Sequence, residues 1–261
     1  MTRLVRIELL KLTTVRLTWW LLATAALLTA FFCTLEAARS GAGKSVAPLF
    51  TYSGLSTIVT GGVWGLLFAA VLGATAVSGE FRHQTATLTY LATPDRNRVL
   101  VAKSIAAALA GAVFGLVGYF VATAVGLGFV AAYGYHVSIG AVTFVRFGAG
   151  HIVAGALLGA AGAALGSLIR SQLAAVIGIL VWAIAGESLI GGLFTSARPY
   201  LPYTDATTLA GTVLGYAGFG PSHNVSGGVP LPFAAAALLL AGLAVVLAAV
   251  ASRTTVRRDI A

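Results

Sequence analysis

Six long apolar segments, separated by shorter polar connections, dominate the pattern along the chain. They cover residues 19–35, 57–78, 104–133, 142–169, 173–194 and 231–251. Each falls within or above the range of about 17–25 residues that a helix rising about 1.5 Å per residue needs to cross the hydrocarbon core of a membrane. The pattern therefore predicts an all-α membrane protein with six transmembrane helices, which form a single transmembrane domain over residues 1–261.

The basic residues of the connections predict the orientation. Six spans place both termini on one side, and that side holds twelve of the sixteen Lys and Arg residues. The other side holds Arg39, Lys44, Arg146 and Arg198. By the positive-inside rule both termini are expected in the cytoplasm. The net charge of +9 then reflects orientation and attraction to anionic headgroups rather than nucleic-acid binding.

Residues 1–18, before the first span, are expected to form a helix that lies in the cytoplasmic interface. Apolar residues fall on one arc of such a helix, with cations largely outside it: Leu4, Val5, Leu9, Leu12 and Val15 against Arg3, Arg6 and Lys11. Glu8 interrupts the apolar arc. This amphipathic pattern is typical of interfacial helices, and a solvated basic tail is the alternative.

The longest outer connection, residues 196–230, combines four prolines with a largely apolar middle at 206–219. Irregular backbone at membrane depth is tolerated only where protein or water covers it. We expect a re-entrant or interfacial helical segment here, with an exposed loop as the alternative.

The overall composition agrees with a membrane protein. Apolar residues make up 59% of the chain and charged residues 9%, with a mean hydropathy of +0.96, whereas a soluble domain carries about a quarter charged residues. The single cysteine, Cys33, lies within the first apolar segment and is expected to pack as an inert apolar side chain.

No motif in the sequence indicates that the chain is an enzyme. Residues 38–45, Ala-Arg-Ser-Gly-Ala-Gly-Lys-Ser, fit a relaxed phosphate-loop pattern, but they follow a predicted membrane span in an outer connection. A working phosphate loop needs a strand before it and a helix after it. The histidines are scattered and there is only one cysteine, so no bound metal or cofactor is expected either.

Two ionisable residues, Glu187 and His151, lie within predicted spans. In consecutive antiparallel helices they reach a similar depth in the outer half of the membrane. A buried pair of Glu187 with His151 or Arg146 is one interpretation. Substrate contact or proton coupling is the other, because intramembrane charges usually face a cavity or a partner.

Glycines recur four residues apart in the third and fourth spans. The pairs are Gly111 with Gly115, Gly155 with Gly159, and Gly162 with Gly166. Such spacing lets helix backbones approach closely. It predicts tight packing within the bundle or, alternatively, a seam between two copies of the chain.

A polar stretch at residues 79–103 separates the second and third spans. Residues 81–92 contain no Gly or Pro and are expected to be helical, and Pro94 ends that helix. Thr93 or Asp95 is expected to cap the next helix. Its cations, Arg96, Arg98 and Lys103, are expected to anchor at headgroups, while Glu80 pairs with one of them or with Lys11.

This stretch resembles the first cytoplasmic loop of ABC-2 type permeases, the membrane subunits of bacterial ABC exporters. The resemblance rests on Gly79-Glu80-x4-Thr85, on Leu91-x2-Pro94-x-Arg96-x6-Lys103, and on the N-terminal Glu8-Leu-Leu-Lys11-Leu. Gln84 stands where that family usually has glycine. The span count and the long last outer connection also agree with the family.

The resemblance implies that residues 79–103 carry a coupling helix that docks a separate ATPase subunit. The docking residues it implies are Glu80, Phe81, Arg82, Thr85, Leu88, Leu91, Pro94, Arg96 and Lys103, with Glu8 and Lys11 in the interfacial helix. ATP and Mg²⁺ would bind the partner subunit. A second permease copy or paralogue would complete the path, in a bacterial plasma membrane.

Two other functions fit the sequence. An ion- or proton-coupled secondary carrier would use Glu187 and His151, although the internal repeat common in such carriers is not evident. A membrane scaffold or sensor subunit would use the same docking loop without transport.

Overall fold

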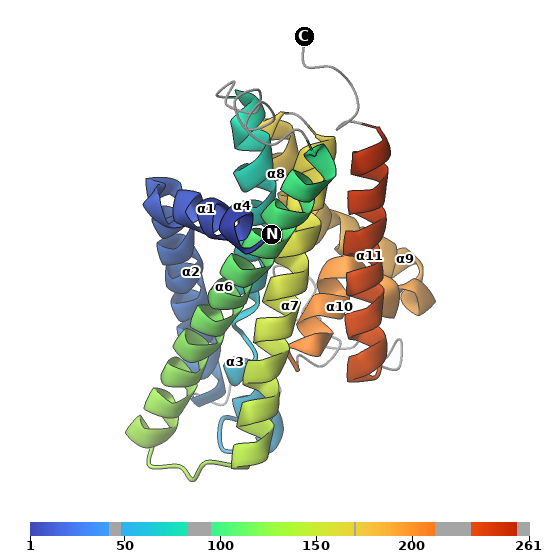
Figure 1. Cartoon of the computed structure of the whole chain (residues 1–261). Coiled ribbons are helices and arrows are strands. Elements are labelled where there is room, and N and C mark those ends of the chain that lie inside the picture. Colours follow the sequence, from blue (N-terminus) through green and yellow to red (C-terminus); the bar gives the residue numbers. More distant parts are fainter. Residues whose placement is uncertain (42–47, 83–94, 170, 212–230, 255–261) are drawn as a thin grey trace.

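The structure is a computed structural model, and it describes residues 1–41, 48–82, 95–169, 171–211 and 231–254. Every element of this described part is a helix (Figure 1). Six of the helical segments are long and apolar enough to cross a membrane. The expected all-α fold, with six helical segments long and apolar enough to cross a membrane, is therefore confirmed for the described residues.

The spans extend the predicted apolar segments at one or both ends. The first is α2 (Arg16–Gly41), the second is α3 (Tyr52–Val59) with α4 (Val63–Arg82), and the third is α6 (Arg96–Ala132). The fourth is α7 (Ala141–Leu168), and the last is α11 (Phe233–Arg253). The fifth is α8 (Gln172–Val181), a π-helical turn η1 (Trp182–Gly186) and α9 (Glu187–Leu193).

Helices α4, α6 and α7 pack against one another and form the centre of the bundle. Their glycines permit this contact: a Cβ atom on Gly111 would overlap the carbonyl of Gly155, and one on Gly162 would overlap that of Ala70. The glycine pairs in α6 and α7 thus serve packing within the chain, the first of the two expected interpretations.

The second span is broken between α3 and α4, which the apolar pattern did not predict. Thr60 ends α3, and Gly61 and Gly62 lead into α4. A Cβ atom on Gly62 would lie 2.7 Å from the backbone of Gly118 in α6. The break therefore lies where two backbones touch, and hydropathy alone cannot reveal such a contact.

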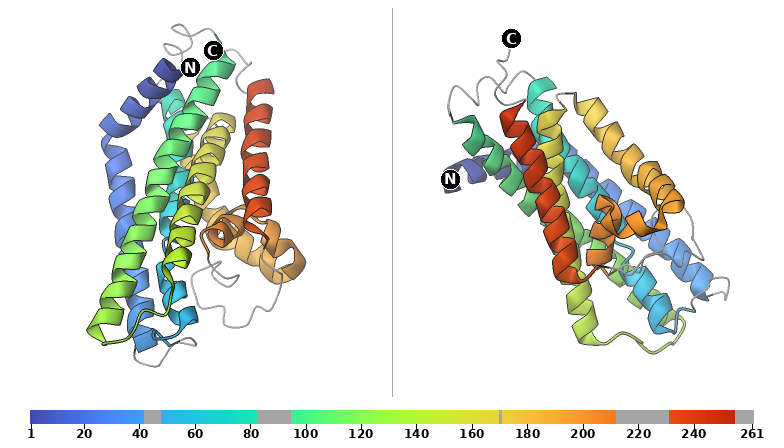
Figure 2. Two further views of the ribbon diagram at one scale, coloured as in Figure 1. Left: turned by 60° about the horizontal axis from the view of Figure 1, so that its bottom comes forward. Right: turned by 90° about the vertical axis from the view of Figure 1, so that its right-hand side faces the viewer.

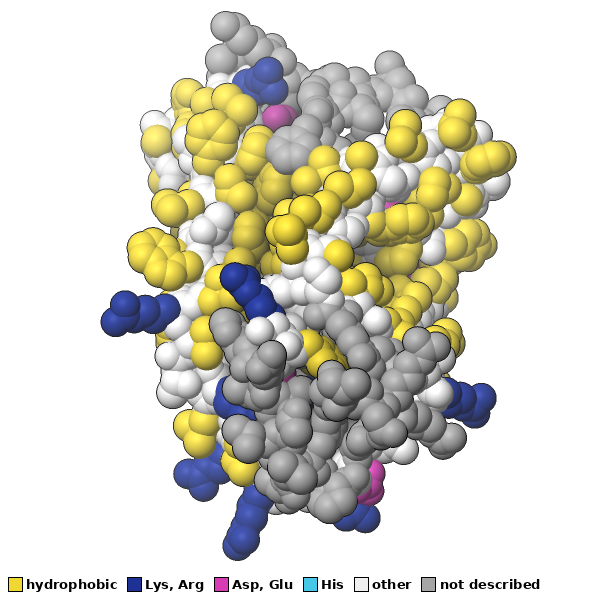
Figure 3. Space-filling model, turned by 90° about the horizontal axis from the view of Figure 1, so that it is seen from above, with side chains coloured by type: hydrophobic (Ala, Val, Ile, Leu, Met, Phe, Trp, Pro, Cys, Tyr) yellow, Lys and Arg dark blue, Asp and Glu magenta, His cyan; other side chains and the backbone are white. Residues whose placement is uncertain are grey.

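Helix α1 (Thr2–Thr14) runs across the bundle end rather than along it, and extended backbone at Val15 turns the chain into α2 (Figure 1). The last turn of α4 and the start of α6 lie at this same end, as does the end of α11 (Figure 2). Seen from this end, Lys and Arg side chains project around its rim (Figure 3).

The chain after the fifth span folds back toward the bundle. A 3-10 helix η2 (Thr195–Tyr200) leads into α10 (Pro202–Leu209), which packs against α7 and α11. Gly150 of α7 meets the carbonyl of Leu209, and Gly211 adopts a φ of +94° against the ring of Phe147. The connection between the fifth and sixth apolar helices is thus partly helical and partly buried up to residue 211, while residues 212–230 lie outside the described part.

Candidate functional site

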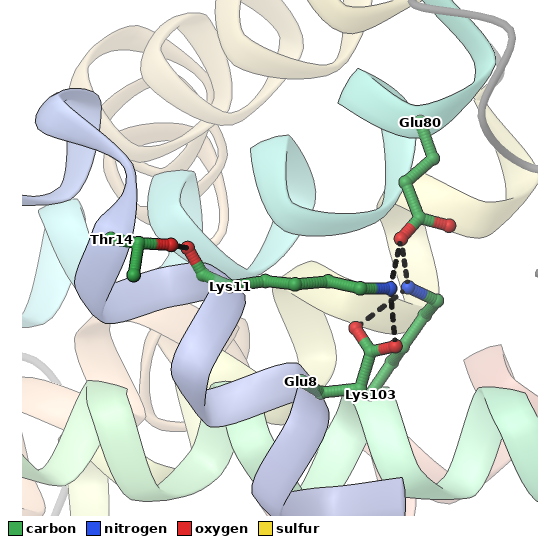
Figure 4. Close-up of polar contacts among 5 residues, drawn as sticks. All are labelled: Glu8, Lys11, Thr14, Glu80 and Lys103. Carbon is green, nitrogen blue, oxygen red and sulfur yellow. Dashed lines mark hydrogen bonds and ion pairs between the residues drawn. The ribbon is translucent and has the colours of Figure 1, made fainter.

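Four charged side chains from three helices meet at the end of the bundle that α1 crosses (Figure 4). Lys103 Nζ of α6 lies 2.8 Å from Glu8 Oε2 of α1 and 2.5 Å from Glu80 Oε1 of α4. Lys11 Nζ lies 2.8 Å from Glu8 Oε1 and 3.1 Å from Glu80 Oε1. Each cation thus bridges both carboxylates, and we call these four residues the charge cluster.

Three members of the charge cluster are shielded from solvent, while the Lys11 side chain is 43% exposed. The Lys103 side chain is 4% exposed, and those of Glu8 and Glu80 are 12% and 15% exposed. Burial alone raises the pKa of the Glu8 carboxyl, but attraction to Lys103 and hydrogen bonds from Lys103 and Lys11 leave it below its usual value. Burial lowers the pKa of Lys11, yet Glu8 and Glu80 raise it overall. The ionised forms of Glu8 and Lys11 are therefore the stable ones.

The cluster explains the charged residue that interrupts the apolar arc of α1. Leu12 on that arc packs with Ala25, Leu72 and Phe114 in the core, and Glu8 faces the same interior. The Glu8 carboxylate forms an ion pair there with Lys103. The charge therefore holds α1 against the bundle instead of weakening the contact between them.

Glu80 pairs with both Lys11 and Lys103, whereas the sequence predicted Lys11 or one of the cations of the third span as its partner. Lys103 does not anchor at headgroups, and this expectation was wrong. Residue 103 lies two turns into α6 and faces α1 and α4, so its ammonium is satisfied by carboxylates. Asp95 caps α6 as expected, with its carboxylate accepting a hydrogen bond from the Arg98 amide at 3.1 Å.

The remaining docking residues divide between described and undescribed parts. Phe81 is half-buried and packs against Val77, Ala107 and Ala163 of the bundle. The next residue, Arg82, is exposed and donates a hydrogen bond to the side-chain oxygen of Gln172 in α8 at 3.4 Å. Arg96 begins α6. Thr85, Leu88, Leu91 and Pro94, together with Gln84, fall in residues 83–94 and lie outside the described part.

A second polar site surrounds Glu187, which is 1% exposed and follows the π-helical turn η1. One carboxylate oxygen accepts from Trp182 Nε1 at 3.0 Å and from the Tyr203 amide at 2.6 Å. The other accepts from the Thr204 amide at 2.7 Å and its hydroxyl at 2.8 Å. Glu187 therefore caps the N-terminus of α10 from another helix, a position that favours negative charge.

His151 is also fully buried, but it lies in a different part of the bundle. Its Nδ1 lies 2.8 Å from the carbonyl oxygen of Phe147, and its ring contacts Tyr119 of α6 at a centroid distance of 5.3 Å. The Tyr119 hydroxyl donates to the carbonyl of Phe144. His151 thus helps to pack α6 against α7.

The expected pairing of Glu187 with His151 or Arg146 is not formed. The hydrogen bonds of Glu187 go to Trp182, Tyr203 and Thr204, and Arg146 is exposed on α7. The expectation failed because consecutive spans are not neighbours over their whole length here. Helix α8 packs mainly against α4, while α11 lies along α7.

The apolar pattern of the sequence reveals neither the partners of Glu187 nor a further buried carboxyl, Asp205. The order Pro202-Tyr-Thr-Asp205 is a helix-start signal, with proline in the first helical position and an acidic residue in the first turn. That signal predicts that a helix starts at Pro202, as α10 does. It does not show that Glu187, from another helix, accepts the hydrogen bonds of the first amides of α10.

No group of three or more potential metal-binding side chains occurs among the described residues. Residues 38–41 of the phosphate-loop pattern belong to helix α2, and the rest lie outside the described part. A comparison of the sequence with models of known protein families finds no match, and neither does a comparison with curated proteins.

Proposed function

We propose that the chain is the permease subunit of an ATP-driven exporter of the ABC-2 type. The observation that carries this proposal is the charge cluster, which ties α1 to the helix before residues 83–94 and to the helix after them. A loop whose two ends are fixed to one another and to a transverse helix is suited to transmit force from a bound partner. The resemblance of residues 79–103 to an ATPase-docking loop supplies the partner.

In this proposal α1 lies in the cytoplasmic interface of a bacterial plasma membrane. Its exposed face carries Arg3 and Arg6 with Ile7 and Leu10, a combination that suits anionic headgroups and the upper acyl chains. Both termini are cytoplasmic, and residues 83–94 face the compartment that holds ATP. Helix α10 belongs to a re-entrant segment that enters from the opposite side.

ATP bound to the partner subunit would drive the cycle by favouring one arrangement of the bundle over another. Such a shift requires that the partner bind the two arrangements with different affinity. The charge cluster makes this possible, because a displacement of residues 83–94 displaces the end of α4 and the start of α6 together with α1. Two permease subunits and two ATPase subunits would form the complete exporter.

The rival proposal of an ion-coupled carrier draws less support from the geometry. It relies on Glu187 and His151, which do not meet, and the hydrogen bonds of Glu187 hold α10 in place. A scaffold or sensor subunit would share the docking surface and would differ only in lacking transport.

Co-purification from native membranes tests the proposal. The tagged chain is expected to bring with it a vanadate-sensitive ATPase activity. A variant with Leu88→Asp and Leu91→Asp is expected to lose that activity while the chain itself still inserts and folds. Phe81 is left unchanged because it packs into the bundle and its loss would disturb folding.

A matched control places two aspartates elsewhere at the same end of the bundle. Thr13 and Asn97 are both exposed there, so Thr13→Asp with Asn97→Asp adds the same charge outside residues 83–94. This control is expected to retain the ATPase. If no ATPase accompanies the wild-type chain, and the purified protein moves solute with a proton gradient alone, the carrier function replaces this proposal.

A further inference from the structure

Asp205 lies in the first turn of α10 and is fully buried. Among the described residues neither of its carboxyl oxygens has a hydrogen-bond partner. An ionised carboxylate in such surroundings would pay the full cost of leaving water, and this cost normally forces a buried acid to take up a proton or a cation. The side chain therefore requires an explanation that packing does not supply.

The donors that would ordinarily serve Asp205 are already used. The free amides at the start of α10 belong to Tyr203 and Thr204, and both donate to Glu187. The nearby hydroxyls of Thr207 and Thr208 donate to the carbonyl oxygen of Thr204. Glu187 has thus taken the capping position, and Asp205 is left buried without a donor.

Within the described ranges, no cation from the surrounding elements neutralises Asp205. Helix α10 packs against η2, α4, α7 and α11. The cation of η2 is Arg198, which packs against Gly191 and forms no ion pair with Asp205. Helix α7 contributes two ionisable groups. Arg146 is exposed, and His151 forms a hydrogen bond with the carbonyl oxygen of Phe147. The charges of α4 and α11, namely Glu80, Arg82 and Arg253, lie at the other end of those helices.

We propose that Asp205 is a proton-binding site of the bundle, neutral while α10 is docked against α7 and α11 and ionised when α10 leaves them. The ligand is a proton rather than a metal ion, because a metal needs several oxygen ligands and the Glu187 oxygens already accept four hydrogen bonds. The site makes the packing of α10 dependent on pH.

The direction of that dependence follows from the charges. Burial and the negative charge of Glu187 raise the pKa of Asp205 from 3.8 to about 7. The folded protein then holds a proton that the unfolded chain has released, so the site stabilises α10 at low pH and loses this effect as the pH rises toward 7. Rising pH therefore loosens the contact of α10 with α7. This inference does not depend on the proposed ATPase partner.

Chemical labelling tests the site on the purified full-length chain. Dicyclohexylcarbodiimide reacts with protonated carboxyl groups in apolar surroundings, and peptide mass spectrometry locates the adduct. A carboxyl with a pKa near 7 is protonated about tenfold more at pH 6 than at pH 8, so labelling of Asp205 is expected to fall by about that factor. Glu187→Gln removes the neighbouring negative charge and is expected to move the midpoint of this labelling profile to lower pH.

A second readout covers the case in which the reagent cannot reach the site. The thermal stability of the wild type relative to Asp205→Asn is expected to fall between pH 5 and pH 8, because only the wild type has a proton to lose there. Asn fills the same space without ionising. The proposal is overturned if Asp205 stays unlabelled and this stability difference is constant with pH, or if Na⁺ protects Asp205 from the reagent at fixed pH.

Discussion

Glu80 and Lys103 lie near the end and the beginning of the two helices that flank residues 83–94, and their side chains meet at 2.5 Å between Oε1 and Nζ. The contact ties the last turn of α4 to the second turn of α6. Glu8 and Lys11 of α1 complete the cluster, so that α4, α6 and the transverse helix α1 share one set of charges. The four charges sum to zero, so that Lys103, Glu8 and Glu80 are shielded from water without leaving a net charge in the cluster.

Removal of one member of the cluster should be costly because it leaves an uncompensated charge. We expect Lys103→Met to lower the free energy of unfolding by about 3 kcal/mol, measured in detergent by SDS-induced unfolding. The double variant Glu80→Gln with Lys103→Met should cost less than the sum of the single variants, since it removes a matched pair. Strict additivity would contradict this account of the cluster.

Arg98→Met is the control for that measurement. Arg98 lies on the same helix and pairs with Asp95 at 2.9 Å, but its side chain is 70% exposed. An exposed pair of this kind contributes about 0–1 kcal/mol. A loss as large as that of Lys103→Met would show that charge on α6, rather than the buried cluster, governs stability.

The apolar pattern was sufficient to predict the six apolar helices, because apolar runs of this length are too long for the helices of an ordinary soluble domain. It was insufficient for the break at Gly61 and Gly62, which depends on contact with Gly118 of α6. It also failed for the order of the helices around the bundle. Hydropathy reports which residues avoid water, and it contains no information on which apolar face meets which.

Acid should release α1 from the bundle. The folded-state pKa of Glu8 lies below its ordinary value, so its stabilising effect is present above pH 4.5 and is lost as the pH falls through the folded-state pKa. We expect the protection of the α1 amides from hydrogen exchange, taken relative to their intrinsic rates at each pH, to fall below the folded-state pKa of Glu8 and to fall more than the protection of the α7 amides. Glu8→Gln should exchange faster at neutral pH and show little further change in acid; an unchanged acid response in this variant would refute the assignment to Glu8.

The sequence predicted only part of the charge cluster, because it shows which side chains need a partner but not which helices pack against one another. The pairing of Glu80 with Lys11 followed from two charges on one side of the membrane that both need a partner. The burial of Lys103 did not follow, because its neighbours in the sequence, Arg96 and Arg98, belong to the polar start of α6. Only the packing of α1 over α6 shows that residue 103 lies beneath another helix.

Close packing of α6 on α7 should make Gly111 intolerant of any side chain. A Cβ atom there overlaps the backbone carbonyl of Gly155, so the two helices must separate. We expect Gly111→Ala to lower stability by about 2 kcal/mol. A Cβ atom on Gly128 of the same helix would meet no other atom within 4 Å, and Gly128→Ala should raise stability by about 0.5 kcal/mol. Equal effects of the two variants would contradict the packing argument.

Glu187→Gln should loosen the start of α10, because an amide offers one oxygen and one NH₂ group where four donors need acceptors. Hydrogen bonds to a charged group contribute about 1.5–3 kcal/mol. We therefore expect the Tyr203 and Thr204 amides to exchange about 10- to 100-fold faster in this variant, measured by hydrogen-exchange mass spectrometry. Trp182→Phe removes one donor and keeps both acceptor oxygens of Glu187. The Tyr203 and Thr204 amides of this variant should therefore exchange at nearly the wild-type rate. If Glu187→Gln leaves exchange unaltered, Glu187 does not hold α10.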